Sequence, residues 1–217
     1  MPRMLVAYDP SWPEQFAAAA ALLRSHGDPD WVIEHIGSTA IPGMRAKPII
    51  DLAVRVADPA DFERHRSALE RSGWRRGSAV RSHPVMLRER DGVRTHIAHF
   101  FTAADWDAVN QRILRDWLLE HPAEADRYRH AKCDAVAAAA RGTSSYSAAK
   151  TPVIQEIVDR ARTAGGCRGS RCRTSSRGVG PCTSPGTQLL SGGAREAGGS
   201  PFCERGEHPG ARQRKHP

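Results

Sequence analysis

The 217-residue sequence contains no long apolar run and no apolar segment close to its N-terminus. A membrane-spanning helix needs roughly 18 or more consecutive apolar residues. A secretory signal peptide needs a shorter apolar core behind a basic start. Because the sequence shows neither pattern, it predicts a cytoplasmic protein with no membrane partner.

Cysteine is scarce in most of the chain, and the common cysteine and serine motifs are missing. Four of the five cysteines lie in residues 164–217, and none of them forms the C-x2-C pair that is typical of zinc sites. The G-x-S-x-G motif that surrounds the nucleophile of many hydrolases is also absent. The sequence therefore supports neither a zinc site nor a serine hydrolase.

Large apolar side chains are almost absent beyond residue 163. Residues 164–217 hold 12 of the 19 glycines and 5 of the 15 prolines. Such a segment cannot bury enough surface to offset the backbone entropy lost on folding, about 1–2 kcal/mol per residue. We predict one domain over residues 1–163, followed by a disordered tail over residues 164–217. The large apolar residues of the tail are Val179, Leu189, Leu190 and Phe202.

The net charge of +8 comes mainly from this tail, which has 9 basic and 3 acidic residues and so carries +6. A basic tail can bind nucleic acid through phosphates. Since it offers almost no aromatic side chains for base stacking, the sequence favours a solvated tail without a partner. A shifted reading frame in a GC-rich gene, suggested by 28 arginines against 4 lysines, is a third explanation.

Hydrophobic periodicity and turn residues in the body predict an α/β (α+β) domain. The expected order is a small mixed sheet flanked by helices, followed by a helical C-terminal part. The expected elements are a helix (11–23), a strand (31–36), a loop (37–47), a strand (48–56), a helix (58–69), two strands (85–90 and 93–101) and three helices (102–118, 122–140 and one from 144 or 151 to 162).

The segment EHIGSTAIPGMRAKPIIDLAV, residues 34–54, concentrates groups that bind phosphate. Gly37 permits a tight turn and a close approach of the backbone to a ligand. Ser38 and Thr39 offer hydroxyl and N–H groups, and Lys47 adds a positive charge. A tight turn with a helix cap is the alternative explanation of Gly37 and Ser38.

Asp51 interrupts an otherwise apolar strand, where an unpaired carboxylate is costly. A metal ion or a cationic ligand partner would offset this cost. A structural salt bridge to Lys47 or Arg94 is the alternative. We expect Asp51 to contact a ligand or a metal ion.

Other pocket candidates follow from alternation and spacing. Alternation along residues 94–101 predicts Arg94 and His96 on one face, toward a ligand, and His99 on the other, at the rim or in packing. His35 either faces the pocket or hydrogen-bonds the loop. Tyr146 and Lys150 lie four residues apart, on one helix face, which either faces the pocket or solvent.

The run HIGSTAIPGMRAKPIIDLAV, with YDPSWPEQF, RTHIAHFF and YSAAKTPVIQEIV, closely resembles the GrpB family, also called UPF0157. The resemblance covers about residues 5–162. The family is similar in fold to the nucleotidyltransferase superfamily of DNA polymerase β, so the resemblance implies a nucleotidyltransferase-like fold. It also includes domains fused to dephospho-coenzyme A kinase, which hints at nucleotide or coenzyme A metabolism.

In that superfamily a Gly-Ser pair cradles a triphosphate, and two acids on the next strand bind magnesium. Gly37, Ser38 and Asp51 match these positions, whereas Ala53 replaces the second acid. The resemblance thus implies binding of a nucleotide or another phosphorylated small molecule. It further implies magnesium-dependent nucleotidyl or phosphoryl transfer, with Asp51 as the catalytic residue and metal ligand. The alternative is a non-catalytic ligand-binding or interaction module that retains the fold without a complete metal site.

Overall fold

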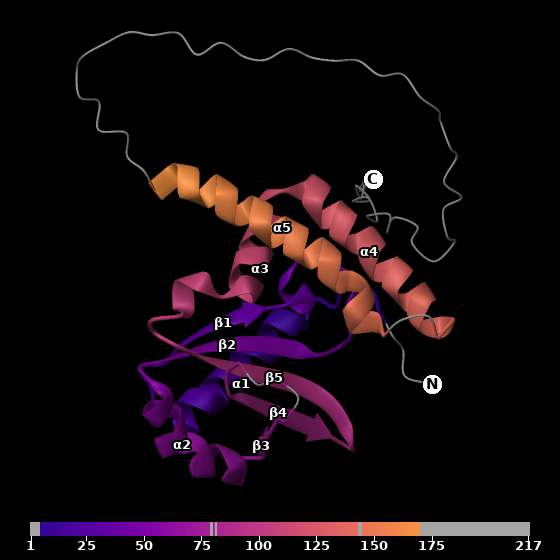
Figure 1. Cartoon of the computed structure of the whole chain (residues 1–217). Coiled ribbons are helices and arrows are strands. Elements are labelled where there is room, and N and C mark those ends of the chain that lie inside the picture. Colours follow the sequence, from indigo (N-terminus) through magenta and orange to yellow (C-terminus); the bar gives the residue numbers. More distant parts are fainter. Residues whose placement is uncertain (1–4, 79, 81, 143–144, 170–217) are drawn as a thin grey trace, which may run out of the picture. The chain divides into compact units, whose positions relative to one another are not determined.

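The computed structural model describes residues 5–78, 80, 82–142 and 145–169 (Figure 1). Those up to Cys167 belong to one compact unit, Met1–Cys167. The part of the expected tail beyond residue 169 lies outside the described residues. None of the described helices is long and apolar enough to cross a membrane.

Five strands form one mixed sheet in the order β1-β2-β5-β4-β3. The central pair, β2 and β5, is parallel, and the other pairs are antiparallel. In the parallel pair, Asp51 lies opposite Ile97 and Ala53 lies opposite His99. The mixed sheet that the sequence predicts is therefore confirmed. The strands are β1 (Val32–Ile36), β2 (Ile50–Val56), β3 (Arg75–Arg76), β4 (Val85–Arg90) and β5 (Val93–Thr102).

Two helices, α1 (Trp12–His26) and α2 (Pro59–Arg71), pack on one face of the sheet. Proline stands in the first turn of both helices, where its missing N–H costs nothing. The side chain of Asp58 caps α2 by accepting a hydrogen bond from the backbone N–H of Asp61. The main hydrophobic core lies between these helices and the sheet, and its large members include Trp12, Leu23, Trp31, Phe62, Trp74 and Phe100.

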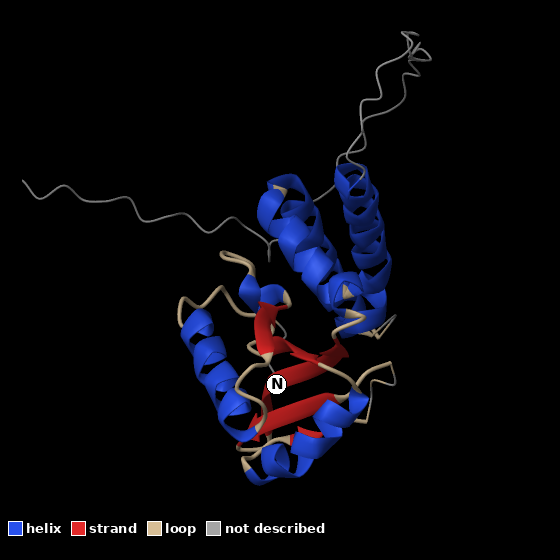
Figure 2. Cartoon of the chain, turned by 90° about the vertical axis from the view of Figure 1, so that its left-hand side faces the viewer, coloured by secondary structure: helices blue, strands red, loops and turns tan. Residues whose placement is uncertain are grey.

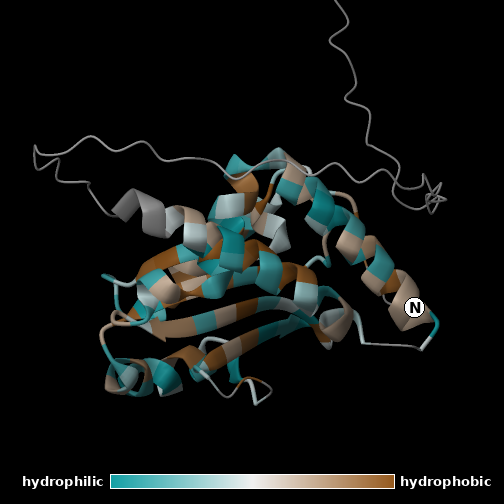
Figure 3. Ribbon diagram, turned by 45° about the horizontal axis from the view of Figure 1, so that its top comes forward, coloured by the Kyte–Doolittle hydropathy of each residue, from teal (hydrophilic) through white to brown (hydrophobic). Residues whose placement is uncertain are grey.

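The helical C-terminal part consists of α3 (Asn110–Glu120), α4 (Pro122–Ala140) and α5 (Tyr146–Gly169). Figure 1 shows these helices grouped together, and Figure 2 shows the strands with helices on more than one side. Figure 3 shows that the helices carry both hydrophilic and hydrophobic residues, as expected for helices that bury one face. A second core cluster joins them to the loop after β1 through Ile41, Met44, Leu118, Tyr128 and Ile157.

Two boundaries differ from the expectation. The segment after β5 forms a short 3-10 helix, η2 (Trp106–Ala108), and α3 begins only at Asn110. The last helix begins at Tyr146, continues through Pro152 and ends at Gly169, so residues 164–169 are helical where the sequence predicted the start of a disordered tail. It therefore includes both Tyr146 and Lys150, whose placement on one helix the sequence left open.

Candidate functional site

The turn after β1 lies directly against Asp51. Gly37 has φ +74° and ψ −171°, a conformation that L-residues rarely adopt. A Cβ at this position would lie 2.5 Å from Oδ2 of Asp51. A short 3-10 helix, η1 (Ser38–Ala40), follows. The sequence predicts that Gly37 lets the backbone approach a ligand closely. In the structure, the group that lies close to Gly37 is the carboxylate of Asp51 on β2.

Three cationic side chains line a pocket of about 280 Å³ beside this turn. Lys47 comes from the loop before β2, Arg94 from β5 and Lys150 from α5. The Lys47 and Lys150 ammonium groups lie 4.3 and 4.9 Å from the centre of the Tyr146 ring, within cation–π range. Burial, and secondly the neighbouring Lys150, lower the pKa of Lys47. The structure therefore brings together cations separated by about a hundred residues of sequence.

Asp51 is the one carboxylate among the described residues that line this smaller pocket. Its side chain is 29% exposed. Burial raises the pKa of Asp51 to about 7, although the positive charges of Lys150 and Arg94 oppose the shift. Near neutral pH the pocket therefore holds three cations and a carboxylate that is only partly ionised.

A larger cavity, of about 1060 Å³, adjoins the smaller pocket. The two share Ser38, Asp51, Ser147 and Lys150 as lining residues. The larger cavity continues between the sheet and the helices α3 and α5. Its walls are partly apolar, with Ile36, Phe101, Val109, Leu114 and Ile154 among them.

His99 lines this larger cavity and lies on the same face of β5 as Phe101 and Ile97, which also line the two cavities. The predicted separation of His99 from His96 by alternation therefore holds, but the cavities lie on the His99 side. Its Nε2 lies 4.0 Å from Oδ1 of Asp51. Its Nδ1 lies 2.8 Å from Nε2 of His83, with which it shares a hydrogen bond. Burial, together with His83, lowers the pKa of His99 to about 4. A neutral histidine pair thus stands beside Asp51.

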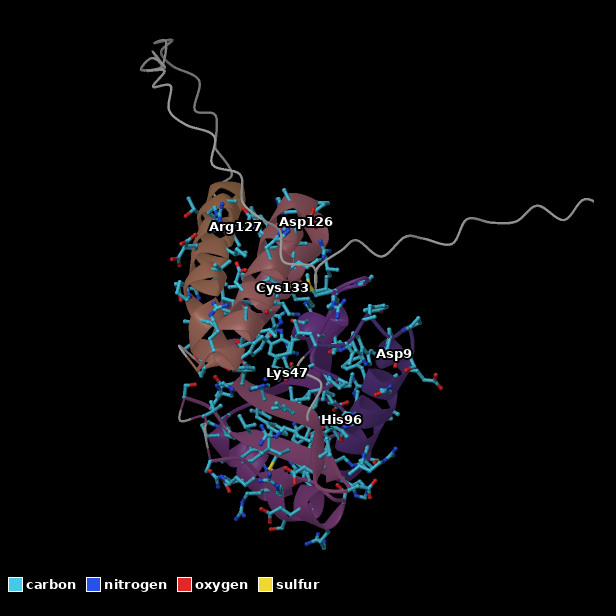
Figure 4. All side chains as sticks on the ribbon, turned by 90° about the vertical axis from the view of Figure 1, so that its right-hand side faces the viewer. Asp9, Lys47, His96, Asp126, Arg127 and Cys133 are labelled. Carbon is cyan, nitrogen blue, oxygen red and sulfur yellow. The ribbon has the colours of Figure 1, made fainter. Side chains whose placement is uncertain are left out.

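His96, which we predicted to contact a ligand, lines neither of these two cavities. The pairing of β4 with β5 shifts register, so that Arg88 lies opposite His96 but Glu89 lies opposite Arg94. The extra residue resets the alternation. As a result Arg94 lines the smaller pocket, whereas His96 lies near Trp74, with ring centres 6.2 Å apart. Figure 4 shows Lys47 where the helices meet the sheet and His96 farther from that junction.

His35 hydrogen-bonds the loop, which is one of the two arrangements that the sequence left open. Its ring stacks on Phe16 at 4.8 Å, and its Nε2 lies 3.0 Å from Oγ1 of Thr39. The Thr39 hydroxyl also donates to the carbonyl of Ile49 at 3.3 Å and is buried. Thr39 lines the smaller pocket, but its hydroxyl is used within the protein. Burial, with Arg115, lowers the pKa of His35 to about 4.

Helix α4 contacts the loop between β1 and β2 through two residues that belong to no sequence motif. The Ser38 hydroxyl lies 3.4 Å from the hydroxyl of Tyr128. The buried Lys132 donates a hydrogen bond to the carbonyl of Arg45. Burial lowers the pKa of Lys132 to about 7, with smaller effects from Lys150 and Arg129. We did not predict a role for Tyr128 or Lys132, because both are part of an ordinary helical pattern.

The described residues do not fit a two-metal centre. Ala53, at the position of the second acid, is fully buried in a cluster with Ile36 and Phe101. His99 stands on the strand where a third acid was expected. Paired magnesium ions need several oxygen ligands, which this set does not provide. The donor set allows at most one magnesium ion, held by Asp51 together with phosphate oxygens of a ligand.

A separate group, formed by Asp28, Asp61 and His65, has the spacing of metal ligands, with its atoms within 4.8 Å of one another. Both oxygens of Asp61 already have partners in the protein. Oδ2 accepts from Nε1 of Trp31 at 3.1 Å and from the N–H of Ala57 at 3.0 Å, and Oδ1 accepts from Arg64. These bonds explain the group as a structural joint between α2 and the start of β1.

The fold and the site define an α/β protein in which a glycine–serine turn lies over the carboxylate of Asp51. Comparison with known families identifies it further. The family described as "GrpB protein" matches residues 2–160. The chain belongs to the GrpB family.

Curated relatives agree with this assignment. A UPF0157 protein of Halalkalibacterium halodurans is 33% identical over 167 residues, covering 72% of this chain and 81% of the relative. A UPF0157 protein of Pseudomonas aeruginosa is 34% identical over 163 residues, covering 70% of this chain and 65% of the relative.

Among solved structures, the conserved protein GrpB from Enterococcus faecalis matches with a TM-score of 0.64 and 26% identity. The match covers 75% of this chain and 99% of that one. The Cid1 poly(U) polymerase matches with a TM-score of 0.38 and 15% identity over 59% of this chain and 45% of that one. The second similarity is too distant to carry a functional argument, whereas the first agrees with the fold described above.

Proposed function

We propose that the smaller pocket binds the phosphate group of a nucleotide or of another phosphorylated small molecule. The observation that carries the proposal is the convergence of Lys47, Arg94 and Lys150 on a pocket whose described lining includes one carboxylate, Asp51. Like charges held close together repel, so such a cluster favours an anionic ligand. Charge-assisted hydrogen bonds from lysine and arginine are the usual means of holding phosphate.

Calorimetric titration of ATP and of inorganic triphosphate tests this proposal. Lys150→Ala removes a cation that lines both cavities, and we expect it to weaken binding of either probe by about 1–3 kcal/mol. The matched control is Arg71→Ala, an exposed cation at the end of α2, on the opposite side of the sheet. If both variants bind both probes as the wild type does, phosphate binds elsewhere or not at all.

Magnesium-dependent nucleotidyl or phosphoryl transfer is the second candidate function, and the position of Asp51 against Gly37 favours it. The buried Ala53 favours the non-catalytic alternative instead. Titration of ATP in magnesium and in EDTA separates the two. In the transfer hypothesis, magnesium strengthens binding to the wild type, and Asp51→Asn abolishes this effect. Identical isotherms of the wild type in both buffers support a binding module without a metal.

A further inference from the structure

The two cavities differ in chemistry although they meet at Asp51 and Lys150. The smaller is lined by three cations, and the larger has rings and apolar side chains in its walls. A ligand that fills both would carry an anionic end and a less polar end. A simple phosphate or a sugar phosphate would leave the larger cavity, about 1060 Å³, mostly unfilled.

The sheet side of the larger cavity carries aromatic rings. The centres of the His83 and Phe101 rings lie 4.3 Å apart at an angle of 40°. The rings of His99 and Phe101 are nearly parallel, with centres 6.2 Å apart. Phe101 itself is buried, so the partly exposed His83 is the ring of this pair on which a base would stack. Stacking of a base on such a side chain contributes about 1–3 kcal/mol per base. Leu114 and Ile154 line the same cavity from α3 and α5, so a flat ring would have apolar contacts from the helices as well.

Amide side chains complete the lining of the larger cavity. Asn110 and Gln111 come from the start of α3, and Gln155 comes from α5. An amide group donates and accepts hydrogen bonds, and this pattern complements the edge of a nucleobase. The side-chain carbonyl of Asn110 already accepts a hydrogen bond from Arg162 at 2.8 Å, and the amide nitrogen of Gln155 donates to Asp159 at 2.8 Å. Gln111 is therefore the amide on which the recognition of a base mainly rests. A plain hydrocarbon chain would make no use of these groups, whereas a flexible chain that carries amides would, so a ligand of that kind is included in the test below. The combination of rings and amides therefore points to a base.

We infer that the ligand is a nucleoside phosphate, with its phosphate between Lys47, Arg94 and Lys150 and its base in the larger cavity beside His83 and Phe101. This inference rests on the proposed phosphate site. It adds the class of ligand and the direction in which the ligand lies, from the cationic pocket toward α3.

Calorimetry with ligand pairs that differ by the base tests the inference. One pair is AMP and ribose 5-phosphate, which share phosphate and sugar. The second pair is ATP and inorganic triphosphate. Pantetheine 4′-phosphate serves as a ligand with a flexible chain and no base. We expect AMP to bind at least about tenfold more tightly than ribose 5-phosphate, and ATP more tightly than triphosphate by a similar factor.

His83→Ala should remove most of this preference and leave the affinity for ribose 5-phosphate and triphosphate unchanged. His83 is partly exposed in the segment before β4, so its truncation spares the core that Phe101 belongs to. His96→Ala, on the opposite face of β5, is the matched control and should retain the preference. Gln111→Ala, also outside the core, is a second variant that should lower AMP affinity alone.

The possible outcomes distinguish a failure of the inferred base site from a failure of the proposed phosphate site. Equal affinities within each pair, or tighter binding of pantetheine 4′-phosphate than of AMP, overturn the inference while the phosphate site stands. A His83→Ala variant that loses affinity for base-free and base-bearing ligands alike also overturns it. If the wild type binds none of these compounds, the proposed function fails, and the inference fails with it.

Discussion

Gly37 combines a left-handed backbone with a close neighbour, and the two effects are separable. Gly37→Ala should cost about 1–3 kcal/mol for the backbone alone, because φ +74° with ψ −171° is a region that is nearly restricted to glycine. The cost should be larger still because its Cβ would meet Asp51 at 2.5 Å. Gly43 has nearly the same φ, +73°, but a Cβ there would have nothing within 4 Å, so Gly43→Ala should show only the backbone cost. Urea unfolding measures both. Equal losses would mean that the contact with Asp51 adds nothing.

The raised pKa of Asp51 makes the free energy of unfolding depend on pH. The unfolded carboxyl loses its proton near pH 4, whereas the folded one keeps it to about pH 7. The folded state thus binds more protons between these values, so stability falls as pH rises from about 4 to 7. The loss contributed by this group is on the order of a few kcal/mol.

Asp51→Asn should remove that contribution. The wild type should lose unfolding free energy between pH 5 and pH 8, and the variant should lose less over the same range. Urea unfolding at both pH values measures the difference, and the comparison with the wild type isolates Asp51 from groups such as His99. A wild type and a variant with the same pH dependence would show that the Asp51 carboxyl titrates normally.

At the scale of elements, Asp61 joins the start of α2 to the indole of Trp31. Asp61→Asn replaces an oxygen that accepts two hydrogen bonds, so we expect it to cost about 1–3 kcal/mol of unfolding free energy. Asp28→Asn is the control, because Asp28 shares the acidic group but accepts neither bond. Thermal unfolding measures both variants. Two results would instead indicate a metal site. One is a higher melting temperature of the wild type with added zinc, and the other is a loss of stability in Asp28→Asn as large as that in Asp61→Asn.

The elements themselves could largely be predicted because their signals are local. The Gly-Ser turn, the apolar strand around Asp51 and the proline-initiated helices are each encoded within a few residues. The sequence could not show that His99 lines the cavity in place of His96, because this depends on a register shift between β4 and β5. The contribution of Tyr128 and Lys132 likewise depends on how α4 packs on a loop about ninety residues earlier.

At the scale of the whole molecule, the last buried side chains that the structure describes lie in α5. Among the described residues of α5, Ile157, Val158 and Ala161 are the last buried ones. Arg162 still hydrogen-bonds the carbonyl of Ala108 at 3.0 Å. Truncation after Arg162 should therefore change the melting temperature by less than about 3 °C.

Truncation after Lys150 is the matching control, because it removes these buried residues and should abolish cooperative unfolding. Differential scanning calorimetry of the two truncated chains and the full chain measures the effect. A fall of about ten degrees or more, roughly 3 kcal/mol, on removing residues 163–217 would place the domain boundary later in the chain.

The three cations of the smaller pocket lie at positions 47, 94 and 150, on a loop, a strand and the last helix. On the ribosome the sheet is therefore complete before the pocket is, because Lys150 leaves the exit tunnel only after α3 and α4 have been synthesised. A nascent chain, or one cut by a protease before α5, lacks Lys150, one of the three cations of the proposed phosphate site. A ligand that needs all three cations thus distinguishes finished molecules from unfinished ones and stabilises the finished ones alone.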